Sequence, residues 1–239
     1  MVRAALALCA LSLTAVNAFG VVANNSLRRL HPSIQRHLSR AAEEISSGND
    51  ERGVVLARAA MVPRQIRVSF SFNGVRSSRK GMLLEQGRRA LKSWNDAIGA
   101  EAFVEASGRA DIRVIFQSEV YQGSRRVAGL TSVSRGYNSR GDSWVAGEVA
   151  ISDRGVNGAE LTGAQVRKIL MHEFGHVAGL DDVGSSSKTM GSVRSDERHV
   201  EVDEESKAAL RTLQATTEAL LSTASAPTSR APVIFKFPN

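Results

Sequence analysis

The stretch of sequence that decides the fold is HEFGHVAGLDD, which spans residues 172–182. His172 and His176 are four residues apart, so on a helix their side chains lie one turn above each other on the same face. Two imidazole nitrogens placed in this way can bind one zinc ion at about 2.0–2.1 Å. Glu173 follows the first histidine and can hold a water molecule at the open position of that metal. The spacing therefore indicates a catalytic zinc site.

The residues that follow the second histidine can complete the metal site. Gly179 can adopt the left-handed conformation that ends a helix, which turns the chain sharply back toward the metal. Asp182, three residues later, could supply an oxygen as the third ligand and leave a fourth position open for water, as catalytic zinc requires. Upstream, the TGAQ sequence of residues 162–165 has the form of a capping box and predicts the start of this helix.

Chance is a poor explanation of this pattern. With the composition of this chain, HExxH would arise roughly once in 150 such sequences. Requiring the glycine at +7 and a His or Asp at +10 lowers this to on the order of one in 30,000. The alternative, in which His172, Glu173 and His176 are ordinary helix residues with no shared ligand, is therefore the weaker interpretation.

The segment from His172 to Met190 resembles the signature of the metzincin metallopeptidases, HExxHxxGxxH/D followed by a methionine. It is most similar to the matrixins, whose Met-turn methionine also lies eighteen residues after the first histidine. The resemblance implies that Met190 packs in a tight turn beneath the metal without binding it; an ordinary core methionine is the alternative. Asp182 departs from the matrixin pattern, which has a third histidine there, and is similar to the snapalysin-type metzincins.

The resemblance covers about residues 65–215 and implies an α+β catalytic domain. Its fold would be a twisted mixed five-stranded sheet with about three helices, in which the active-site helix is followed by the Met-turn. Apolar alternation and helical spacing in the sequence predict strands near 66–72, 102–106, 111–116, 130–134 and 147–152, and helices at 82–98, 162–177 and after Asp203. By analogy, Gly129, Leu130 and Thr131 belong to the edge strand that pairs with an extended substrate.

The metal content follows from the same comparison. The additional histidines that hold a structural zinc in many matrixins are missing, so we expect one catalytic Zn²⁺. Calcium could also bind, with Asp153 as a ligand by analogy. The single cysteine, Cys9, lies in the expected signal peptide, so the mature chain has no thiol that could act as a cysteine switch.

The two ends of the chain predict further segments. Residues 1–18 contain Arg3, a 13-residue apolar run and a small residue at Ala18, which is typical of a cleaved signal peptide rather than a membrane anchor. Apolar residues recur at helical spacing from Ser26 to Ser46, so residues 19–64 form an N-terminal helical segment, either a removable pro-segment or an extra helical element. Residues 216–239 have the composition of a flexible tail.

Composition narrows the function further. The formal charge is +7, but no basic block is interleaved with aromatic residues, which make up only 5% of the chain, so nucleic-acid binding is not expected. We expect a secreted, extracellular and monomeric zinc metalloendopeptidase without stable membrane insertion. It would hydrolyse protein or peptide substrates through a metal-bound water, with Glu173 as general base. The alternatives are a secreted non-catalytic binding protein on the same scaffold and a basic, surface-adhering protein whose HExxH is accidental.

Overall fold

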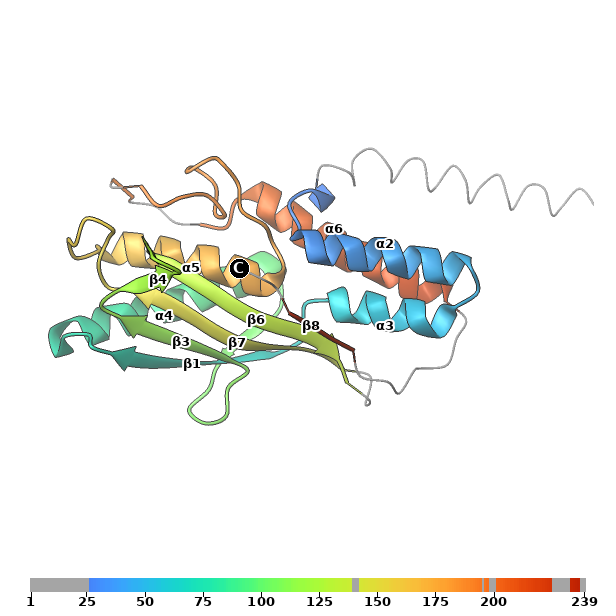
Figure 1. Ribbon diagram of the computed structural model, residues 1–239, viewed down its shortest axis with the longest axis horizontal. Coiled ribbons are helices and arrows are strands. Elements are labelled where there is room, and N and C mark those ends of the chain that lie inside the picture. The colour runs from blue at the N-terminus through green and yellow to red at the C-terminus, as the bar shows by residue number, and fades with distance from the viewer. Residues whose placement is uncertain (1–25, 139–141, 195, 198–200, 225–232, 237–239) are drawn as a thin grey trace, which may run out of the picture.

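The structure is a computed structural model that describes residues 26–138, 142–194, 196–197 and 201–224, and the backbone of 233–236 (Figure 1). The expected signal peptide, residues 1–18, lies outside the described residues. In the described part of the chain, no helix combines the length and the apolar character needed to cross a membrane.

One twisted sheet organises the molecule, with its strands in the order β2-β1-β3-β7-β6-β8. The strands are β1 (Ile66–Asn73), β2 (Phe103–Glu105), β3 (Ile112–Gln117), β6 (Gly129–Tyr137), β7 (Ser143–Ser152) and β8 (Val233–Lys236). The strands β2, β1, β3 and β7 run parallel to one another, whereas β6 is antiparallel to β7. Five of these strands make the mixed sheet that the sequence predicts, and β8 adds a sixth along part of β6. The predicted α+β fold is confirmed.

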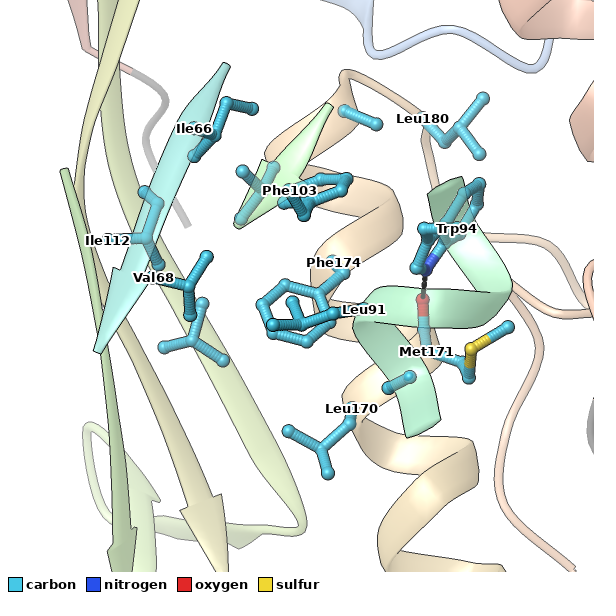
Figure 2. Close-up of a cluster of buried hydrophobic side chains, with 14 of the residues drawn as sticks. Ile66, Val68, Leu91, Trp94, Phe103, Ile112, Leu170, Met171, Phe174 and Leu180 are labelled. Carbon is cyan, nitrogen blue, oxygen red and sulfur yellow. Dashed lines mark hydrogen bonds between the residues drawn. The ribbon is translucent and has the colours of Figure 1, made fainter. Parts of the chain in front are cut away.

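Two helices cover one face of the sheet, α4 (Ser77–Ile98) and α5 (Gly163–Ala178). The apolar alternation of the strands buries Ile66 and Ile112 against these helices, as Figure 2 shows. Trp94 of α4 is fully buried, and its indole N–H donates to the carbonyl of Met171 on α5 at 2.9 Å. Burial of such large side chains contributes roughly 1.5–3 kcal/mol each. The core therefore fixes α5, which carries both histidines, against α4 and the sheet.

Three further helices lie together beside the end of the sheet: α2 (Pro32–Ser46), α3 (Asp50–Ala60) and α6 (Glu204–Thr223). The sequence predicts α2 and the start of α6 at its cap, Asp203, but α6 runs past residue 215 to Thr223. It does not predict α3, because seven of its eleven residues are buried and its sequence lacks a clear polar face. A small hairpin, β4 (Val120–Gln122) with β5 (Arg125–Val127), was also not predicted.

Candidate metal centre

The helix α5, which carries both histidines, begins and ends as its sequence dictates. Thr162 caps it by accepting from the backbone N–H of Gln165, whose side chain accepts from the backbone N–H of Thr162. At its C-terminal end Gly179 has φ of 100°, a conformation that costs glycine little and other residues more. The backbone N–H of Leu180 then donates to the carbonyl of Gly175, which closes the turn and directs the chain back toward the histidines.

The structure brings His172, His176 and Asp182 together. The Nε2 atoms of the two histidines are 3.2 Å apart, and Oδ1 of Asp182 lies 3.0 Å from the first and 3.3 Å from the second. Zinc with bonds of about 2.0–2.1 Å in tetrahedral geometry separates its ligand atoms by about 3.3–3.4 Å. The three atoms therefore form one face of a tetrahedron of nearly the size that zinc requires. They leave the fourth corner to another ligand.

Hydrogen bonding prepares the ligand atoms for a metal. Nδ1 of His176 lies 3.0 Å from the carbonyl oxygen of Leu180, which can only accept, so Nδ1 donates and Nε2 is left to bind the metal. Hydrogen bonds from His172 and His176 hold the pKa of Asp182 well below its usual range. Burial alone lowers the pKa of His176, but its bond to Asp182 and the charge of Glu173 outweigh this and raise it. Asp182 is therefore ionised, and without a metal its negative charge favours the protonated form of His176.

The carboxylate of Glu173 lies between α5 and β6 and is only 5% exposed. The hydroxyl of Thr131 donates to its Oε2 at 2.6 Å. Gly129 lies close to the other oxygen, since an added Cβ there would overlap Oε1 and lie 2.9 Å from Cδ. The resemblance implies that Gly129 and Thr131 belong to a strand that binds substrate, but it does not predict their contact with Glu173. Two residues of β6 thus fix the position of the proposed base.

Met190 is 2% exposed and packs against Gly175, the residue of α5 that precedes His176. A Cβ at Gly175 would overlap its sulfur and lie 3.0 Å from its Cε, so the glycine inside HEFGH gives the methionine its space. Thr189, the preceding residue, donates its backbone N–H to the carboxylate of Asp203 at 2.8 Å. The Met-turn is thus tied to the cap of α6. This role of Gly175 was not predicted, although its place between the histidines is a signal in the sequence.

Two cavities meet at this site, and both are lined by Gly129, His172, Glu173 and Asp182. The larger, about 680 Å³, continues toward residues 190–194, and the smaller, about 320 Å³, runs along β6 to His31. β6 pairs with β8 only over its last four residues, 134–137. Within the described chain, no strand pairs with the outer edge of residues 129–133. The free edge of this strand can therefore pair with another extended chain through main-chain hydrogen bonds.

Two other observations concern expectations from the sequence. His31, which is not among the predicted site residues, lines the smaller cavity and comes from the segment before α2. Asp153, the suggested calcium ligand, is 3% exposed, and its Oδ1 accepts from Nε of Arg79 at 2.8 Å. The carboxylate is thus neutralised by an arginine, and a calcium site at Asp153 is not supported.

Comparisons with known proteins give two findings. The family model of the matrixins matches residues 63–215. Among solved structures, archaemetzincin from Methanopyrus kandleri is similar, with 13% sequence identity and a TM-score of 0.37. That match covers 67% of this chain and 96% of the other. No curated protein sequence gives a significant match.

Proposed function

Because the chain belongs to the matrixin family, we propose that it is a secreted zinc endopeptidase that cleaves peptide bonds in proteins or peptides. The observation that carries this proposal is the triangle of ligand atoms from His172, His176 and Asp182, with the carboxylate of Glu173 beside it. Three protein ligands and one open position are typical of catalytic rather than structural zinc.

The residues around the metal site have separate tasks in this proposal. When bound, zinc would act as a Lewis acid that polarises a water molecule and the carbonyl oxygen of the substrate. Glu173 is the general base: its carboxylate takes the proton from the attacking water and then delivers it to the leaving amide nitrogen. The hydroxyl of Thr131 holds one carboxylate oxygen, which leaves the other for the proton. His176 is oriented by the carbonyl of Leu180.

Substrate binding follows from the same strand. The outer edge of residues 129–133 offers backbone N–H and C=O groups beside Glu173, so an extended peptide would add to the sheet as a further strand. Main-chain hydrogen bonds contribute affinity with little regard to sequence, while the cavity of about 680 Å³ accepts a side chain of the substrate. This arrangement favours cleavage within extended or unfolded segments of a protein.

The proposal is tested on the purified protein with casein as substrate. We expect about one zinc per chain. Cleavage should stop with a chelator and return when zinc is added. Glu173→Gln keeps the shape and the contact with Thr131 but cannot take a proton, so it should retain zinc and lose cleavage. His172→Ala should lose both. Cleavage by Glu173→Gln at the rate of the wild type, or cleavage unaffected by complete removal of zinc, would contradict the proposal.

A further inference from the structure

The segment just before α2 is bound to the turn that carries the third metal ligand. The backbone N–H of His31 donates to the carbonyl of Gly179 at 2.8 Å, and the N–H of Asp181 donates to the carbonyl of Arg29 at 2.8 Å. These two hydrogen bonds pair Leu30 with Leu180 in an antiparallel bridge. We call residues 29–31 the strap. It holds residues 179–181, and Asp182 is the next residue along the chain.

The strap is itself fixed in the core. Leu30 is completely buried and belongs to the same apolar cluster as Phe174 and Met190. The guanidinium of Arg29 forms an ion pair with Glu205 at the start of α6. Lys188, in the loop before Met190, binds the same carboxylate at 2.7 Å. Movement of the strap would therefore also disturb the core and the loop that leads to the Met-turn.

A buried arginine joins α3 to the end of the active-site helix. Arg135 of β6 is 1% exposed, and burial lowers its pKa to about 10. One of its nitrogens donates to the carbonyl of Val177 near the end of α5 at 2.6 Å, and another to the carbonyl of Ala60, the last residue of α3, at 3.3 Å. A cation at this place complements the negative end of the α5 dipole. The first partner of this arginine is in the active-site helix and the second is in the N-terminal helices.

The helices outside the region that matches the family also pack on one another. The matched region spans residues 63–215, whereas α2 and α3 precede it and the last turns of α6 follow it. Ala41 of α2 and Leu56 and Ala57 of α3 form a buried cluster that Leu220 and Leu221 of α6 complete. In Figure 1 the three helices lie side by side at one end of the sheet. The two extensions thus share one apolar core, which removal of either would expose to water.

We propose that residues 26–61 are a permanent part of the active protein, in which the strap positions the turn of Asp182, and are not a pro-segment removed on activation. The backbone bridge between the strap and residues 179–181, the two hydrogen bonds of Arg135 and the shared helical core support this assignment. The segment thereby contributes to zinc affinity without supplying a ligand. This inference rests on the proposed zinc site, but not on peptide hydrolysis.

The first experiment cuts the chain between the helices and the sheet. A recognition sequence for a specific protease is inserted between Arg64 and Gln65, both exposed, in the full chain. After cleavage, we expect the helical fragment to remain with the rest of the chain in gel filtration and the zinc content to be unchanged. Separation of the fragment under native conditions, with a remainder that binds zinc as tightly as the uncut chain, would overturn the proposal.

The second experiment removes a single strap contact. His31 has φ of −53° and ψ of 139°, which proline accepts, so His31→Pro deletes the N–H that binds Gly179 without forcing the backbone. His31→Ala is the matched control, because it also lacks the imidazole but keeps the N–H. Relative to this control, His31→Pro should raise the zinc dissociation constant roughly two- to tenfold, the worth of one hydrogen bond. Equal zinc affinity of the two variants would contradict the role of the strap.

These readouts separate the two proposals. If the intact protein binds no zinc, the proposed function fails, while co-elution of the cut helices still tests whether they are permanent. If zinc binds and casein is cleaved but the helices separate without effect, only the role of the strap is wrong.

Discussion

The contact between Thr131 and Glu173 allows a sharp test of how the proposed general base is positioned. Thr131 is only 6% exposed, and its hydroxyl donates to Oε2 of the carboxylate at 2.6 Å. It also lies 3.2 Å from the backbone carbonyl of Glu173. Thr131→Val replaces the hydroxyl with a methyl group of similar size and suits a strand equally well. The substitution therefore removes the donor and little else.

The expected loss can be worked from this geometry. A hydrogen bond to a charged group contributes about 1.5–3 kcal/mol when its partner is left unsatisfied. Glu173 is only 5% exposed, so water cannot easily replace the hydroxyl. Because about 1.4 kcal/mol corresponds to a factor of ten in rate, kcat should fall about 10- to 100-fold if the bond acts by orienting the base. KM and zinc affinity should change little, since no ligand atom is touched.

The assay is steady-state cleavage of a peptide substrate together with zinc competition against a chromophoric chelator. Thr131→Ser keeps the hydroxyl and should restore most of kcat. Ser132→Val is the matched control, because Ser132 lies next on β6 but is exposed, and it should behave as the wild type. An unchanged kcat in Thr131→Val would refute the reasoning, as would an equal loss in Thr131→Ser or a loss explained by missing zinc.

Three further predictions concern packing, pH and the Met-turn. Gly175→Ala should destabilise the protein by about 1–2 kcal/mol in urea unfolding, because overlap with Met190 outweighs the better helix propensity of alanine. A second change, Met190→Ala, should reduce that loss of stability. A single variant more stable than the wild type would contradict the packing of Gly175 against Met190. Zinc affinity should weaken as pH falls through the raised pKa of His176, because the protonated ring cannot bind the metal, whereas Asp182 stays ionised. In the metal-free protein, the stability that the pair of His176 and Asp182 contributes should instead decline as pH rises through the same pKa. A zinc affinity independent of pH between about 5.5 and 8 would contradict this prediction. Asp203→Ala should cost about 2 kcal/mol, because it removes the cap of α6 and the tie to the turn before Met190, and a urea midpoint equal to wild type would refute it.

The sequence predicts those parts of the fold whose signals are local. The capping box at Thr162, the cap at Asp203 and the alternation in β1 identify elements because each depends on neighbouring residues. The helix α3 was missed because burial on several sides removes the polar face on which helix prediction relies. The hairpin of β4 and β5 was missed because strands of three residues carry too short an alternating pattern.

The same difference between local and long-range contacts applies to the candidate site. The histidines, the glutamate and the aspartate lie within one helix and one turn, so their spacing in the sequence predicts their approach in space. The contacts of Glu173 with Thr131 and of Gly179 with His31 join residues far apart in the chain. No local pattern contains such pairs, because they depend on how β6 and the strap are placed by the whole core. These residues determine how firmly the site is held rather than which atoms form it.

The exposure of Asp182 shows why that firmness matters for this chain. Its side chain is 71% exposed, whereas those of His172 and His176 are 19% and 22% exposed. The histidines are held by packing of α5, but an exposed carboxylate on a turn has little packing to restrain it. Its position depends instead on the turn itself, which is closed by Gly179 on one side and bound by the strap on the other. A third ligand carried on a turn therefore requires a support that the helix alone does not provide, and in our proposal the N-terminal segment supplies it.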